Sequence, residues 1–94
     1  MNEIDRIYKS ARDVYSRKLR NATNQGTERH KAEKNLYQTW REAAIDLRDE
    51  ARRGVVTTEE LRKRLCYENR EKLVKEWKDK ESRRAELEFR AKTE

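Results

Sequence analysis

The feature that most constrains this chain is that none of its 94 residues is proline and only two, Gly26 and Gly54, are glycine. Proline fixes the backbone φ angle and lacks the N–H group that a helix interior requires, so it ends or kinks helices. At the average usage of about 5%, a chain of this length contains several prolines. Their absence allows long helices, and the two glycines divide the chain into three pieces.

Apolar residues recur every three or four positions in the first two pieces, which is the spacing of one face of a helix. The first face consists of Ile4, Ile7, Tyr8, Ala11, Val14, Tyr15, Leu19 and Ala22, and the second of Ala32, Leu36, Trp40, Ala43, Leu47 and Ala51. Asn2 and Thr27 are candidate N-caps, because their side-chain oxygens can accept a hydrogen bond from the first helical turn. The pattern predicts helices over about residues 3–23 and 28–53.

The third piece begins with the strongest local signal in the chain. Thr57 and Glu60 have the spacing of a capping box, in which each side chain accepts a hydrogen bond from the backbone N–H of the other residue. The apolar face that follows fades after Trp77, but oppositely charged residues four positions apart continue beyond it and favour a helix. We therefore predict an all-α, antiparallel three-helix bundle over residues 1–77. Its third helix, residues 58–77, is expected to continue into a charged helical extension, residues 78–94.

Large aromatic side chains lie on or beside these apolar faces, at Tyr8, Tyr15, Tyr37, Trp40 and Trp77. Exposed aromatic rings can stack on the bases of single-stranded nucleic acid. A bundle with few leucines and isoleucines, however, needs large rings to fill its interior. We interpret these residues as core.

No group of residues with catalytic or metal-binding spacing emerges. His30 is the only histidine and Cys66 the only cysteine, and they fall in different predicted helices, whereas a zinc site needs about four such ligands. We interpret His30 as a solvated side chain in a first helical turn and Cys66 as a small buried thiol. The expectation is a non-enzymatic protein with no catalytic residues, no metal and no cofactor. The unpaired cysteine and the lack of a long apolar run favour the cytoplasm over a membrane.

Residues 57–67 resemble the first helix and turn of the lambda-repressor-like helix-turn-helix family, whose second helix reads DNA. In that family a small residue usually follows the first leucine and a glycine usually opens the turn. Arg62 and Cys66 occupy those places here, and the half-acidic residues 68–71 are expected to continue the helix. We therefore assign the chain to no family.

Positive charge is concentrated around the first predicted turn. Residues 17–34 contain six Lys and Arg against two Glu, which is four of the six net positive charges of the chain. Arg29 and Lys31 fall in the first turn of a helix, where cations are unfavourable by about 0.3–1 kcal/mol each, and residues placed against local preference are candidates for function. The predicted nucleic-acid-binding residues are Arg17, Lys18, Arg20, Asn24, Gln25, Arg29, Lys31 and Lys34. We expect phosphate contacts with low sequence specificity to DNA or RNA.

The charged extension is the alternative functional region. A helix without a core of its own can persist because it meets a partner, so residues 78–94 are candidates for docking on a larger assembly or on a second copy of the chain. The predicted partner-binding residues are Arg83, Arg84, Leu87 and Phe89. In this alternative the protein is an adaptor or inhibitor and a possible homodimer.

Overall fold

Every regular element in the described part of the chain is a helix. The computed structural model describes residues 2–23 and 25–93, with side chains described as far as Arg90. Its elements are α1 (Glu3–Arg20), α2 (Glu28–Arg52), α3 (Thr58–Arg64), the one-turn 3-10 helix η1 (Tyr67–Asn69) and α4 (Arg70–Thr93). The predicted all-α class is confirmed for these residues.

Three predicted caps set the starts of α1, α2 and α3. The Asn2 side chain accepts a hydrogen bond from the Asp5 backbone N–H at 2.9 Å, Thr27 accepts one from His30 at 3.2 Å, and Thr57 accepts one from Glu60 at 3.1 Å. Gly26, in the loop before α2, and Gly54, just after α2, have φ angles of 92° and 79°, a region that side chains with a Cβ atom rarely adopt. Local sequence therefore determines where these helices begin and why the chain turns between them.

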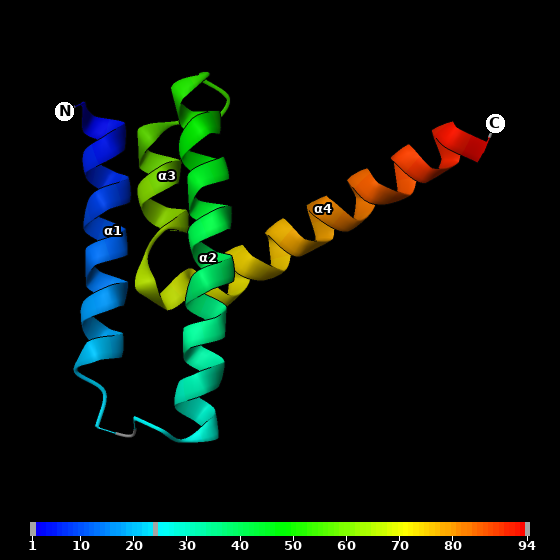
Figure 1. Ribbon diagram of the computed structural model, residues 1–94. Coiled ribbons are helices and arrows are strands. Elements are labelled where there is room, and N and C mark those ends of the chain that lie inside the picture. The colour runs from blue at the N-terminus through cyan, green and yellow to red at the C-terminus, as the bar shows by residue number, and fades with distance from the viewer. Residues whose placement is uncertain (1, 24, 94) are drawn as a thin grey trace.

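The helices α1 and α2 form an antiparallel pair, and α3 lies beside the end of this pair that is remote from the Gly26 loop (Figure 1). The interior of this body holds Tyr15, Trp40 and Leu61, whose side chains are almost completely buried. Tyr15 lies 5.2 Å from Trp40 and 4.8 Å from Tyr37 between ring centroids. The prediction that the aromatic residues form the core is confirmed, with Tyr37 and Trp77 at its partly buried margin.

The third helix differs from the prediction, because it is broken between Leu65 and Asn69. Cys66 adopts an extended conformation, with φ −58° and ψ 138°, and the side chain of Asn69 donates a hydrogen bond to the Lys63 carbonyl at 2.8 Å. Tyr67 then packs edge-on against Tyr15, with 5.3 Å between ring centroids. These contacts end α3 after two turns and redirect the chain. The expected single helix over residues 58–77 is therefore wrong, and α4 leaves the other helices at a steep angle (Figure 1).

The first half of α4 packs on α2 and its second half does not. Leu73 and Val74 are buried, and Lys80 forms ion pairs with Glu50 and, at 3.5 Å, with Asp46. The hydrogen bond to Glu50 raises the pKa of Lys80, which therefore stays charged. From Ser82 to Arg90 all side chains are exposed. The extension predicted to start at residue 78 thus keeps its contact with α2 as far as Lys80.

Deletion of residues 82–94 is expected to lower the melting temperature by less than about 4–8 °C, the shift that corresponds to about 1 kcal/mol in a domain of this size. Deletion of residues 78–94 also removes the Lys80 contacts with α2, so this shorter protein is expected to melt at a lower temperature. Circular dichroism of both truncated proteins measures the difference. An unfolded 1–81 protein would contradict this boundary.

Candidate nucleic-acid interface

The loop between α1 and α2 brings the predicted cations to one end of the molecule. The Gln25 side chain donates a hydrogen bond to the Arg20 carbonyl at 2.7 Å and closes the end of α1, while Thr27 opens α2 two residues later. Gln25 therefore has a structural role in the loop. Arg17, Lys18 and Arg20 precede the loop, and Arg29, Lys31 and Lys34 follow it. Asn24 lies outside the described residues.

All six of these cations have exposed side chains. In the described part of the chain, Lys31 is the one among them that forms an ion pair, with Glu28 at 3.9 Å, and the Glu28 side chain is 95% exposed. Exposed pairs of this kind contribute little. These cations are therefore available to an anionic ligand.

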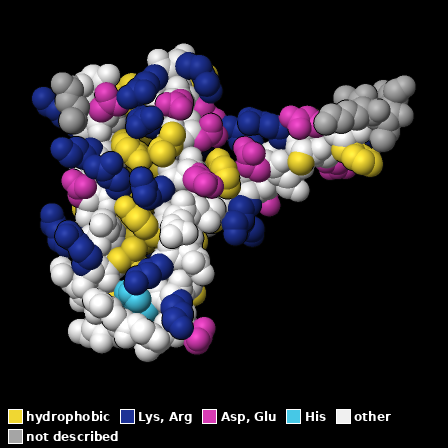
Figure 2. Space-filling view, in the orientation of Figure 1, with side chains coloured by type: hydrophobic (Ala, Val, Ile, Leu, Met, Phe, Trp, Pro, Cys, Tyr) yellow, Lys and Arg dark blue, Asp and Glu magenta, His cyan; other side chains and the backbone are white. Residues whose placement is uncertain are grey.

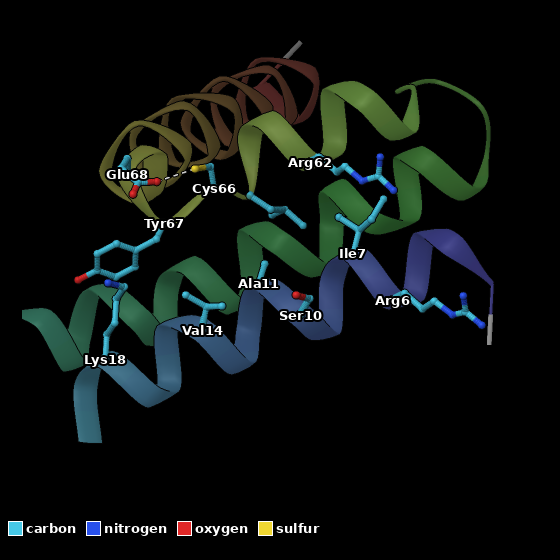
Figure 3. Close-up of a pocket in the computed structure, with 11 residues that line it drawn as sticks. Arg6, Ile7, Ser10, Ala11, Val14, Lys18, Arg62, Cys66, Tyr67 and Glu68 are labelled. Atoms are coloured by element: carbon cyan, nitrogen blue, oxygen red, sulfur yellow. Dashed lines mark hydrogen bonds between the residues drawn. The ribbon is translucent and has the colours of Figure 1, made fainter. Parts of the chain in front are cut away.

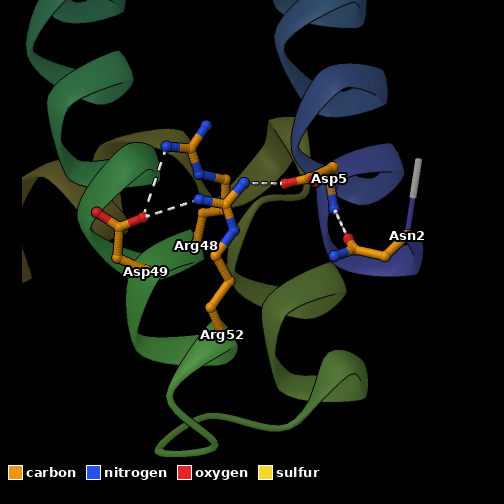
Figure 4. A network of polar contacts seen from close by, with 5 residues as sticks. All are labelled: Asn2, Asp5, Arg48, Asp49 and Arg52. Carbon is orange, nitrogen blue, oxygen red and sulfur yellow. Dashed lines mark hydrogen bonds and ion pairs between the residues drawn. The ribbon is translucent and has the colours of Figure 1, made fainter.

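Several cations at the opposite end of the α1–α2 pair are held by carboxylates, although Arg6 and Arg53 there form no ion pair among the described residues. Arg52 bonds Asp5 and lies 3.7 Å from Asp49, which also pairs with Arg48 at 3.5 Å (Figure 4). Arg62 and Arg64 at this end bond carboxylates at 2.7 and 3.2 Å, those of Glu3 and Glu60 respectively. Arg52, Arg62 and Arg64 are therefore engaged in surface ion pairs, unlike most of the cations around the α1–α2 loop.

The cations on both sides of the α1–α2 loop are here called the hairpin cations: Arg17, Lys18, Arg20, Arg29, Lys31 and Lys34. Glu33, which lies among them in the sequence, is bound mainly by residues of the protein interior. Its carboxylate accepts hydrogen bonds from Arg70 at 3.1 and 3.4 Å and from the Tyr15 hydroxyl at 3.3 Å. The hydrogen bonds from Arg70 lower the pKa of Glu33, and burial raises the pKa of Tyr15. One of the two glutamates counted against the hairpin cations is therefore balanced by a cation from α4.

Lys18 is a hairpin cation that also contacts an aromatic ring of the protein. Its ammonium group lies 4.6 Å from the centre of the Tyr67 ring, and the Arg70 guanidinium lies 4.1 Å from the same ring. Such cation–π contacts are worth about 0.5–1 kcal/mol at exposed sites. Lys18 thus contributes to packing around η1 as well as to surface charge.

The sequence interpretation missed two cations on the outer face of α1. Arg6 and Lys9 line a shallow hollow together with Arg17. Figure 2 shows Lys and Arg side chains spread along the α1 side of the molecule rather than gathered at the loop alone. The signal was present in the sequence, since Arg6, Lys9 and Arg17 share a helical face with Arg20, interrupted by Asp13.

The expectations for the single histidine and the single cysteine are both wrong. His30 is 4% exposed rather than solvated, and Cys66 is exposed rather than buried. The Cys66 thiol donates a hydrogen bond to the Glu68 carboxylate at 2.6 Å. The exposure of Cys66 goes with the break after α3, which replaces the expected continuous helix. Among the described residues, no group of three or more His, Cys, Asp or Glu is placed to hold a metal ion.

The predicted partner-binding residues all lie on the exposed half of α4. Leu87 and Phe89 are 65% and 67% exposed, and Arg84 forms an ion pair with Glu81 at 3.5 Å. Arg83 is also exposed. The structure therefore separates these four residues from the hairpin cations, on a helix that points away from the α1–α2 pair (Figure 1).

Comparison with protein-family models, curated proteins and solved structures found no match for this chain. None of the helices in the described residues has the length and apolar character needed to cross a membrane.

Proposed function

We propose that this is a non-enzymatic protein that binds nucleic acid, mainly through phosphate contacts and with low sequence specificity. The observation that carries the proposal is the contrast in pairing: the hairpin cations are exposed with little internal neutralisation, whereas Arg52, Arg62 and Arg64 toward the opposite end are held by carboxylates. Polyanionic backbones bind such surfaces by releasing condensed counterions. The cytoplasm is the compartment proposed, in keeping with a single cysteine that has no partner for an internal disulfide.

The binding surface we propose combines the hairpin with the outer face of α1. Arg29 and Lys31 stand in the first turn of α2, where the helix dipole disfavours cations, so a ligand offers the compensation that the helix does not. Arg17 and Arg20 lie on the neighbouring end of α1, and Arg6 and Lys9 extend the same charge along the helix. Contacts of this kind fix a phosphate backbone without reading bases.

Replacing Arg17, Arg20, Arg29 and Lys31 together by glutamine is expected to weaken binding and flatten its salt dependence. Each neutralised phosphate of duplex DNA contributes roughly 0.9 to the slope of log affinity against log salt, so this slope should decrease in magnitude by about 3–4. These four side chains are exposed, so the fold should survive. Fluorescence anisotropy with a labelled 20-base-pair duplex and a single-stranded RNA, over a salt series, measures the effect.

The matched control replaces Lys72, Lys75, Lys78 and Arg83 on α4 by glutamine, which removes the same charge from exposed positions elsewhere. Binding by this control should stay close to that of the parent protein. An equal loss of affinity in the control would mean that total charge, rather than the hairpin, attracts the nucleic acid, and the proposed interface would be rejected.

A second candidate function rests on the exposed half of α4. Leu87 and Phe89 are large apolar side chains that remain mostly exposed, and such residues are typical anchors of helix-mediated docking. In this alternative the protein is an adaptor that docks through Arg83, Arg84, Leu87 and Phe89 on a larger assembly or on a second copy. Binding would then depend on the two apolar residues and would be less sensitive to salt.

A further inference from the structure

A groove of about 530 Å³ lies between α1 and the segment formed by α3 and η1. Ile7, Ala11 and Val14 follow one another along the α1 wall, and Tyr67 stands at one end of the opposite wall (Figure 3). Val14 is 38% exposed although it belongs to the apolar face of α1. The centre of the groove is therefore apolar and accessible.

The groove exists because the third helix is broken. The short α3 covers the first half of α1, and the chain then crosses to α2, on which α4 packs. A third helix continuing along the pair would have covered Val14. The apolar face of α1 around Val14 is therefore not covered by another helix in the described residues.

The charges at the groove are predominantly positive. Arg6 and Arg62 lie at one end and Lys18 at the other, while Glu68 is the one carboxylate that lines it (Figure 3). Arg62 also pairs with Glu3, but Arg6 and Lys18 have no ion pair in the described part of the chain. An apolar centre between cationic ends complements an apolar helix face flanked by carboxylates.

We propose that this groove docks an acidic amphipathic helix of a partner protein. From Arg6 to Lys18, α1 advances about 18 Å at 1.5 Å per residue, which matches roughly three turns of a docked helix. Apolar residues spaced three and four positions apart on that helix meet Ala11 and Val14, and its carboxylates meet the cations at the two ends. The proposal goes beyond the nucleic-acid interface, with which the groove shares Lys18 and, at the hollow on the outer face of α1, Arg6, Ser10 and Val14.

Two other occupants fit less well. Nucleic acid would bring bases to the groove, but the Tyr67 ring already contacts Lys18 and Arg70 and packs against Tyr15, so it is engaged within the protein. The exposed half of α4 from a second copy carries Arg83, Arg84 and Arg90 beside Glu86 and Glu88, so it offers the groove cations no net negative charge. Charge complementarity therefore selects the acidic helix.

The test uses the full chain and a dye-labelled 18-residue helical peptide that has leucines three and four positions apart and glutamates elsewhere. A matched peptide has lysine in place of every glutamate. Because Cys66 lines the groove and is the only cysteine, its reaction with a maleimide reports occupancy independently of anisotropy. The glutamate peptide should bind, slow Cys66 labelling about tenfold at saturation, and be preferred over the lysine peptide.

Val14→Asp is expected to weaken peptide binding at least tenfold, whereas the matched change Val55→Asp, at an exposed valine between α2 and α3, should have no effect. Melting curves verify that both variants fold. Three results would overturn the proposal. They are equal binding of the two peptides, unchanged peptide binding by the Val14→Asp variant, and protection of Cys66 by duplex DNA but not by the glutamate peptide. The variant in which glutamine replaces Arg17, Arg20, Arg29 and Lys31 distinguishes the two surfaces. It should lose affinity for nucleic acid, but the glutamate peptide should still protect Cys66 from labelling.

Discussion

Replacing Trp40 by alanine is expected to lower the free energy of unfolding by about 3–5 kcal/mol, the usual cost of removing a large aromatic side chain from a core. Trp40 is 1% exposed and packs against Tyr15 and Tyr37. Alanine leaves a cavity where three aromatic rings now meet. The decrease is a large share of the 5–15 kcal/mol typical of a folded domain, so urea unfolding followed by circular dichroism should detect it easily.

The indole group offers an internal control for the source of this effect. Its N–H is buried and has no hydrogen-bond partner among the described residues, so the stabilisation comes from packing alone. Trp40→Phe keeps most of the ring and removes the unpaired donor, and it should therefore cost much less than alanine. Val55→Ala, at a side chain that is 69% exposed, should be nearly neutral. A Trp40→Ala protein as stable as the parent would show that the indole lies outside the core.

Replacing Glu33 by glutamine is expected to cost about 1.5–3 kcal/mol at neutral pH, the range for hydrogen bonds to charged groups. The change removes the charge that Arg70 contacts and weakens the acceptor of the Tyr15 hydroxyl. The two charged side chains are 20% and 28% exposed, so the cost should stay below the roughly 3–5 kcal/mol that breaking a fully buried pair costs. Glu28→Gln, at the exposed partner of Lys31, is the matched control and should change stability by less than about 0.5 kcal/mol.

The difference in the free energy of unfolding between the parent protein and Glu33→Gln should depend on pH in a defined direction. Because the hydrogen bonds from Arg70 hold the pKa of Glu33 below its ordinary value of 4.5 in the folded state, the carboxylate stabilises the fold fully above that value. Its contribution disappears as the pH falls through the lower, folded pKa. The free energies of unfolding of the parent protein and Glu33→Gln should therefore differ by a constant amount between about pH 6 and 8. The two values should converge in acid. A difference that grows on acidification would contradict the assigned interaction.

Elements specified by local sequence were predictable, and the element specified by distant contacts was not. The caps at Asn2, Thr27 and Thr57 depend on residues at most three positions away. The break after α3 depends on the packing of Tyr67 against Tyr15, and it contains neither proline nor glycine. The comparison with the helix-turn-helix family placed a turn at Cys66, which is where the helix breaks. The inference that the helix continues there was wrong, because the extended conformation of Cys66 is open to any residue.

The same distinction applies to the candidate interface. The cluster of cations between residues 17 and 34 was visible because its members are close in sequence. The neutralisation of Glu33 by Arg70 was not, since these residues are 37 positions apart. The groove beside Val14 was hidden for the same reason, because it follows from the direction that α4 takes after the break. Long-range contacts therefore decide which of the charges and apolar faces in this sequence remain available to ligands.

Two ion pairs between α4 and α2 fix the direction of α4 relative to the α1–α2 pair. Arg70 at its first residue and Lys80 three turns later both bind carboxylates of α2, so the bearing of the free end is set at two points about 15 Å apart along the helix axis. Residues 81–93 continue beyond these contacts as one helical arm. Two ligands held at the hairpin and on this arm would therefore sit at a fixed separation and angle, and the protein would serve as a spacer with a preferred orientation.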